Sequence, residues 1–247
     1  MTLLGMFRRG ANELLRHLGV TIVRLRDLPC GRRIRMMRNH GIETIVDVGG
    51  NIGSYGAELR ESGYSGRIIS FEPTDGAYRK LAERARADRL WTVFKTAIGE
   101  FDGEVTINVA ANEGASSSLL PMLELHKQCA PEACFVSSEK VNLNTLNKAL
   151  KDILQPQDRV LLKIDTQGYE HMVLKGASEI LPQVELIECE LSFVPLYDGQ
   201  LLFGEMLDLL KRLGFIPVQM VDGFTDPRTG HNLQMDCIFA RNGEVGA

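Results

Sequence analysis

The sequence predicts an α/β protein with one seven-stranded, mostly parallel sheet and helices on both faces. The chain has 247 residues and is 44% hydrophobic, which is enough for one sizeable core. From Thr44 onward, short β-rich runs alternate with amphipathic stretches, the pattern of a parallel sheet covered by helices. No repeat or long Pro/Gly/Ser linker divides the chain.

The strands and helices follow from residue type and spacing. The predicted strands are Thr44–Val48, Arg67–Phe71, Thr92–Lys95, Val160–Ile164, Glu185–Glu190, Ile216–Val221 and Met235–Ala240. Apolar residues three or four apart predict the helices Ser54–Glu61, Gly76–Ala87, Glu170–Ile180 and Phe203–Leu213. Gly214 is expected to cap the last helix.

Two segments interrupt this alternation. Val105–Val109 follows a Phe-Asp-Gly-Glu turn and is predicted as an added strand. Ala111–Ser138 is polar, rich in serine and long for a connection between a strand and a helix. A loop of that length is typical of a substrate cover.

Residues 1–40 are predicted to form a basic helical extension, and residues 41–247 a single domain. The extension holds nine arginines against Glu13 and Asp27, a charge of +7; because the whole chain carries −4, the remainder carries −11. Apolar residues recur at helical spacing from Leu4 to Leu18. We expect this helix to pack against the domain, with contact to an anionic membrane surface as the alternative.

Composition excludes several classes of protein. The acidic domain lacks the basic face of a nucleic-acid binder, so we expect no nucleic-acid partner. No apolar run approaches the ~18 residues of a membrane span. The five scattered cysteines form no Cys-x-x-Cys pair, so we expect them to be reduced in a cytoplasmic protein.

The most informative motif runs from Val46 to Gly53, where a β-branched strand enters a glycine turn and then a helix. This is the geometry of the first unit of a nucleotide-binding sheet. Glu72 follows the next strand and can accept hydrogen bonds from ribose hydroxyls. A glycine turn that only connects strand to helix is the plain alternative.

The spacing favours S-adenosylmethionine over NAD. A dinucleotide site has glycine at positions one, three and six of its fingerprint, but counting from Gly49 these positions hold Gly49, Asn51 and Ser54. Asp47 would repel a diphosphate and could bind the ammonium group of a methionine moiety. The expected cofactor-binding residues are Asp47, Gly49, Gly50, Asn51, Gly53, Glu72, Pro73, Thr96 and Ala97.

Three residues are candidates for catalysis. Asp165 follows a buried strand, where ligands bind in open α/β sheets, and could orient an acceptor, contact the cofactor, join a metal or cap the next helix. Glu190 ends the following strand. His126 lies in the expected cover loop and is a candidate general base for a hydroxyl. Amino-group methylases of nucleic acids typically carry a D/N-P-P-Y/F turn at the position of Asp165, and this chain does not.

With these residues described, the chain from about Ile42 to Arg241 resembles the FkbM family of S-adenosylmethionine-dependent methyltransferases. The resemblance is carried by the following motifs: V-D-V-G-G-N-I-G, F-E-P, S-S-S-L-L-P-M, K-I-D-T-Q-G-Y-E, E-L-S-F-V-P-L-Y-D-G-Q and L-Q-M-D-C-I-F. It implies a class I methyltransferase fold and methyl transfer to oxygen, commonly a sugar hydroxyl of a glycolipid or a natural product. Many members read I-D-V-E-G, whereas this chain has Gln167 in place of the glutamate. The change removes a possible metal ligand, so we expect no metal.

We therefore predict an O-methyltransferase that uses S-adenosylmethionine and acts on a small-molecule or glycolipid acceptor. Two alternatives stay open, a nicotinamide-dependent oxidoreductase and a cofactor-binding module without turnover.

Overall fold

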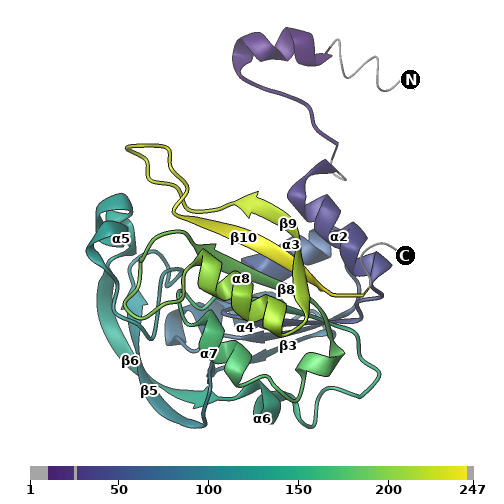
Figure 1. The fold of residues 1–247 in the computed structure, drawn as a ribbon, viewed down its shortest axis with the longest axis vertical. Coiled ribbons are helices and arrows are strands. Elements are labelled where there is room, and N and C mark those ends of the chain that lie inside the picture. Colours follow the sequence, from purple (N-terminus) through teal and green to yellow (C-terminus); the bar gives the residue numbers. More distant parts are fainter. Residues whose placement is uncertain (1–10, 25–26, 244–247) are drawn as a thin grey trace.

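The computed structural model describes residues 11–24 and 27–243 of the chain, and its centre is a seven-stranded sheet (Figure 1). Its strands are β1 (Thr44–Val48), β2 (Arg67–Phe71), β3 (Trp91–Phe94), β7 (Val160–Ile164), β8 (Val184–Ser192), β9 (Phe215–Asp222) and β10 (Gln234–Arg241). Their order across the sheet is β3-β2-β1-β7-β8-β10-β9. All pairs are parallel except those that β10 makes with β8 and β9. The predicted fold class is confirmed.

The strand order reverses between β1 and β7. The chain moves outward from β1 to β3 and then returns to place β7 on the other side of β1, with Val48 beside Ile164 in register. In sheets of this type, ligands bind beyond the carboxyl ends of the strands at such a switch point. The ends of β1 and β7 therefore mark the expected site.

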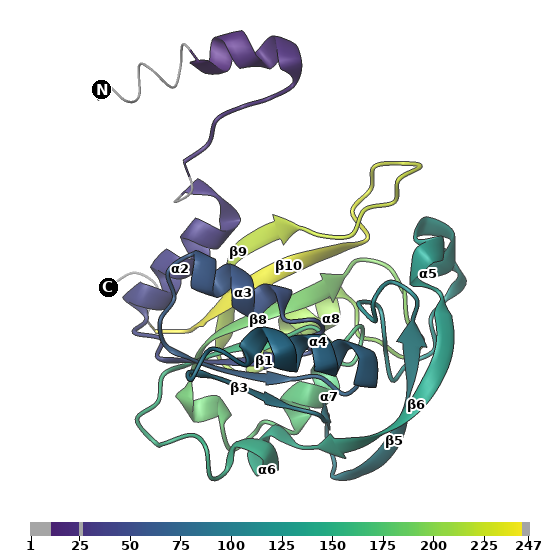
Figure 2. The ribbon, with the colours of Figure 1, turned by 180° about the vertical axis from the view of Figure 1, so that it is seen from behind.

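Helices cover both faces of the sheet, as Figures 1 and 2 show from opposite sides. The helices of one face are α2 (Pro29–Asn39), α3 (Ser54–Glu61) and α4 (Asp75–Ala85), and those of the other are α6 (Leu146–Leu150), α7 (Glu170–Lys175) and α8 (Phe203–Arg212). Met37, Leu59 and Leu81 fill the first core, while Leu146 and Leu210 belong to the second. Burial of these apolar side chains on both faces is the main driving force for the fold.

The segment between β3 and β7 forms a small second sheet at one end of the molecule, seen in Figure 2. It contains β4 (Ala97–Ile98), β5 (Gly103–Ala110) and β6 (Phe135–Asn144) in the order β4-β6-β5. The added strand predicted at Val105–Val109 is thus present but does not join the main sheet. The long loop predicted to reach Ser138 instead includes α5 (Glu124–Cys129), a 3-10 turn at Pro131–Ala133 and the start of β6. The alternation of buried Val141 and Leu143 was an available signal for β6.

Two glycines lie at helix ends. α7 ends at Lys175, earlier than predicted, and the next residue, Gly176, lies against a crossing segment, since a Cβ there would be 2.0 Å from the carbonyl oxygen of Gly99. Gly214 adopts φ 87° just after α8, as expected of a helix cap.

The first described part of the extension, residues 11–24, does not pack against the domain, whereas α2 at its end does. Residues 11–15 are helical and continue into a 3-10 turn at Arg16–Leu18, which Figure 1 shows standing apart from the sheet. Leu14 and Leu18 are 79% and 74% exposed. The expectation that this helix packs on the domain is therefore wrong for these residues, since Gly19 ends the helix and an extended segment leads away from it. Residues 1–10, on which part of that expectation rests, lie outside the described residues.

Within residues 11–24 and 27–243, no helix is long and apolar enough to cross a bilayer.

Candidate active site

The glycine turn after β1 is held between two neighbouring strands. The amides of Gly49 and Gly50 both donate to the carbonyl of Phe71, at 3.0 and 2.9 Å. Gly49 has φ 80°, and a Cβ on it would lie 1.9 Å from the carbonyl oxygen of Asp165. Only glycine therefore allows the ends of β1 and β7 to approach so closely.

Glu72 is fixed beside this turn. Its Oε2 accepts from the amide of Asn51 at 3.0 Å, and its Oε1 accepts from the amide and hydroxyl of Thr74 at 2.8 and 2.6 Å. Burial raises the pKa of Glu72 against the effect of these hydrogen bonds. A carboxylate has about four acceptor positions, so Oε2 keeps one for a ligand hydroxyl.

A cavity of about 420 Å³ opens at this edge of the sheet. The sequence-predicted residues among its lining are Gly49, Gly50, Asn51, Glu72, Pro73, Thr96, Ala97 and Asp165. The expected cover contributes residues 112–115, Ser117 and Leu119. The side-chain amide of Asn51 donates to the carbonyl of Glu113 at 3.1 Å, which couples this cover to the glycine turn. A buried carboxylate with a free acceptor position beside a main-chain turn fits the ribose end of S-adenosylmethionine.

Asp47 and Gly53 do not line this cavity. Asp47 is fully buried beneath the turn, where it accepts from the hydroxyl of Ser70 at 2.8 Å and pairs with Lys163 Nζ at 3.1 Å. This placement corrects the expectation that Asp47 meets a ligand ammonium, because its carboxylate already has a cationic partner. Gly53 adopts φ 83° and serves as the residue before α3.

Lys163 connects Asp47 to the glycine turn. Its Nζ donates to the carbonyl of Gly49 at 3.0 Å and lies 3.5 Å from Oδ2 of Asp165. Burial by itself would lower the pKa of Lys163, but the charges of Asp47 and Asp165 overcome this and raise it. The lysine therefore stays charged, and its contacts with Asp47 and Gly49 link the ends of β1 and β7.

Gln167 joins the two carboxylates proposed for catalysis. Its Nε2 donates to Oδ1 of Asp165 at 2.8 Å and to Oε2 of Glu190 at 2.9 Å, while its Oε1 accepts from the hydroxyl of Tyr197 at 2.8 Å. Gln167 is buried, and its backbone adopts φ 56°, in the left-handed region. Only this amide orientation satisfies all three partners, since the opposite one would point oxygen at two carboxylates. Sequence reasoning treated Gln167 only as a lost metal ligand and missed this role.

A second cavity, of about 250 Å³, adjoins the first and shares Ser54, Tyr55, Lys163 and Asp165 with it. Its walls also include Glu188, Glu190 and Asp236. Glu190 lines this second cavity and not the first. Burial, followed by the charges of Asp165 and Asp236, raises the pKa of Glu190 well above its ordinary value and favours its neutral form. Asp165, with a side chain 39% exposed, is the carboxylate that faces both cavities.

His126 is placed away from both cavities. It lies in α5, is 3% exposed, and packs against the rings of Tyr197 and Phe224 with centroid distances of 5.2 and 5.3 Å. Burial lowers its pKa. The structure thus corrects its assignment as the general base, because the imidazole is buried against two aromatic rings and lines neither of the two cavities.

Within the described ranges, no group of three or more His, Cys, Asp or Glu side chains is arranged to hold a metal ion.

Comparison with known proteins identifies the family. The family model for the methyltransferase FkbM domain matches residues 47–217. Among solved structures, the chain is similar to methyltransferase FkbM from Methylobacillus flagellatus KT, at 16% identity and a TM-score of 0.45, over 79% of this chain and 43% of that one. The present chain thus spans less than half the length of that protein.

Other solved methyltransferases are similar to the chain at lower identity. One is the 1,6-didemethyltoxoflavin-N1-methyltransferase of Burkholderia thailandensis, at 12% identity and a TM-score of 0.46 over 87% of this chain and 80% of that one. Another is the magnesium protoporphyrin IX methyltransferase of Synechocystis PCC 6803, at 10% and 0.47 over 96% of each chain. The comparison with curated proteins found no match. Because the family model covers more than half of the sequence, the chain belongs to the FkbM family of methyltransferases, whose cofactor is S-adenosylmethionine.

Proposed function

We propose that the protein transfers the methyl group to oxygen, at a hydroxyl of a sugar or a related small molecule, such as a glycolipid or a glycosylated natural product. The observation that carries this proposal is the position of Asp165. Asp165 lines both the cofactor cavity and the adjoining cavity, and its side chain is 39% exposed. A hydroxyl entering the second cavity would therefore meet a proton acceptor next to the methyl donor.

The residues around Asp165 suit this role. S-adenosylmethionine supplies an electrophilic methyl group on its sulfonium. Gln167 holds Oδ1 of Asp165, and Lys163 lies near Oδ2, so the carboxylate has a defined orientation. Asp165 accepts the hydroxyl proton as the oxygen attacks. Glu72 and the glycine turn position the cofactor, and the cover segment excludes water.

The charge of the second cavity supports a neutral acceptor. Its walls hold two cationic residues, Lys163 and Arg33, against four acidic ones besides the neutral Glu190: Glu58, Asp165, Glu188 and Asp236. A phosphate or carboxylate near the reacting hydroxyl would be repelled by this excess of acid groups. A sugar hydroxyl carries no such charge, so the cavity supports a glycoside over a nucleic acid. The five free cysteines support a reducing, cytoplasmic setting.

The test is a transfer assay with S-adenosylmethionine labelled on its methyl group. The acceptors would be a panel of glycosides, phenols, amines and transfer RNA, and the product would be located by mass spectrometry and NMR. A methyl ether on a glycoside, lost in Asp165→Asn, is expected. Methylation of an amine or of RNA would overturn the oxygen assignment. Tight cofactor binding without turnover on the whole panel would favour a binding module, and NAD binding would favour the oxidoreductase alternative.

A further inference from the structure

Residues 11–24 form a small folded unit outside the domain. The side chain of Asn12 donates to the carbonyl of Ile22 at 3.1 Å and accepts from the amide of Ile22 at 2.6 Å. These two bonds tie the extended segment after Gly19 back onto the helix. The segment therefore has a defined shape although it does not pack on the sheet (Figure 2).

This unit exposes an unusual amount of apolar surface. Its exposed apolar residues are Leu14, Leu18, Val20, Ile22 and Val23, with exposed fractions between 44% and 79%. Other large apolar residues exposed on the described chain are dispersed over the domain, among them Leu90, Phe101 and Val136. Isolated apolar residues on a surface are ordinary, but a cluster within ten residues indicates a contact surface.

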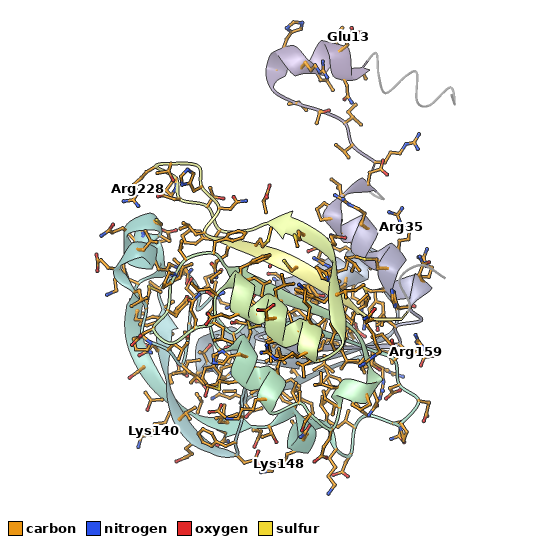
Figure 3. The ribbon with its side chains drawn as sticks, in the orientation of Figure 1. Glu13, Arg35, Lys140, Lys148, Arg159 and Arg228 are labelled. Atoms are coloured by element: carbon orange, nitrogen blue, oxygen red, sulfur yellow. The ribbon has the colours of Figure 1, made fainter. Side chains whose placement is uncertain are left out.

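The charge of the same segment identifies the kind of surface. From Leu14 to Arg26 the sequence has three arginines and no acidic residue. Exposed arginines continue along α2, where Figure 3 labels Arg35. The domain itself is acidic, so an anionic surface would attract the extension and repel the rest of the molecule. Apolar and basic side chains together on a short helical segment are the composition of an interfacial membrane anchor.

We propose that residues 11–24 bind reversibly to an anionic lipid bilayer, with the apolar side chains at the acyl boundary and the arginines at the headgroups. The proposal is independent of the methyl acceptor, since it rests on the extension alone. A second copy of the chain is the competing occupant, because the acidic domain of one molecule could attract the extension of another.

The test is sedimentation of the full chain with sucrose-loaded vesicles. Vesicles of phosphatidylcholine with phosphatidylglycerol are compared with vesicles of phosphatidylcholine alone, at low and high salt. Two double variants test the apolar and the electrostatic contribution separately. Leu14→Ser with Leu18→Ser removes apolar side chains, and Arg16→Glu with Arg24→Glu reverses two positive charges. Matched controls on the domain are Leu90→Ser with Val136→Ser, and Arg79→Glu with Arg86→Glu. Unchanged cofactor affinity by calorimetry shows that each variant is folded.

We expect the wild type to sediment with anionic vesicles and to be released by salt. Each extension variant should lower the partition coefficient by about tenfold or more, and each control by less than about twofold. Wild-type protein that stays in the supernatant at low salt would overturn the proposal, as would equal losses in the controls. A concentration-dependent dimer that Leu14→Ser with Leu18→Ser abolishes, without vesicle binding, would assign the surface to a second copy.

Discussion

The side-chain amide of Gln167 donates to the carboxylate of Asp165 at 2.8 Å, across the turn that follows β7. The same nitrogen donates to Glu190, so one neutral amide bridges the two acidic side chains and supplies a hydrogen bond to each. This arrangement leaves Asp165 oriented toward both cavities and makes the amide, which has no charge, central to the electrostatics of the site.

Replacing Gln167 by glutamate should convert this arrangement into three adjacent carboxylates. We expect Gln167→Glu to lower the free energy of unfolding by roughly 2–4 kcal/mol at pH 8, because the two hydrogen bonds donated by Nε2 are lost and a buried charge is added. Addition of Mg²⁺ or Mn²⁺ should recover part of this loss, since the three carboxylates then form an oxygen-ligand set. Thermal unfolding with and without the ions measures both effects. Gln167→Met, which adds no charge, is the control and should not respond to cations.

The wild-type enzyme is expected to keep its activity after exhaustive chelation. Asp165 and Glu190 are bridged by an amide, and two carboxylates are too few ligands for a tight magnesium site. Initial rates before and after EDTA treatment measure this. A loss of activity that Mg²⁺ restores would show that metal takes part and that Asp165 and Glu190 bind it.

Glu72 should dominate recognition of the cofactor. Glu72→Ala removes a carboxylate that contacts Asn51 and Thr74 and faces the cavity, so we expect binding of S-adenosylmethionine to weaken by about 1.5–3 kcal/mol. Isothermal titration calorimetry gives the change directly. Glu83→Ala, an exposed glutamate on α4, is the matched control. Equal affinity in the Glu72 variant would remove this residue from the cofactor site.

Substitutions of Asp165 and His126 should have different effects, the first on catalysis and the second on stability. Asp165→Asn is expected to lower kcat by ~10²–10⁴ with cofactor affinity retained, as for loss of a general base. His126→Ala should lower the free energy of unfolding by about 1–3 kcal/mol, because it leaves a void beside Tyr197, while kcat changes little. His126→Phe restores an aromatic ring there and should recover stability. If His126→Phe were stable yet inactive, the imidazole would be required after all.

Glu170 should give the protein a measurable pH dependence of stability. Burial raises its pKa to about 7, although the amides of Thr166 and Gly168 donate to it. Between pH 4.5 and about 7, the folded state therefore holds a proton on Glu170 that the unfolded chain, with a pKa of 4.5, has released. Stability from this group is present below the unfolded pKa and is lost as pH rises toward 7, by roughly 2 kcal/mol between pH 5 and 7.

Denaturant unfolding of wild type and Glu170→Gln across this pH range isolates that contribution. The variant should lose less stability than wild type as the pH rises, because its side chain does not titrate. Glu83→Gln should behave as wild type. Parallel curves for wild type and Glu170→Gln would show that Glu170 keeps an ordinary pKa.

The sequence by itself determined the main sheet and the cofactor edge. Runs such as Val160–Ile164 are apolar except for one lysine, so they are stable as strands buried on both faces, and β1, β2 and β7 have the predicted bounds. The glycine turn was readable because its backbone requires glycine at Gly49, and Glu72 because it follows a strand that neighbours the turn. Such features depend on residues close together in the chain.

Only the tertiary structure decided which polar side chains meet. Asp47 and Lys163 are far apart in sequence and become partners because β1 pairs with β7 in a register that sets them side by side. His126 is enclosed by Tyr197 and Phe224, residues far along the chain from it, so no local pattern predicts its burial. Long-range packing determines these positions, and the periodicity of a single segment carries no information about it.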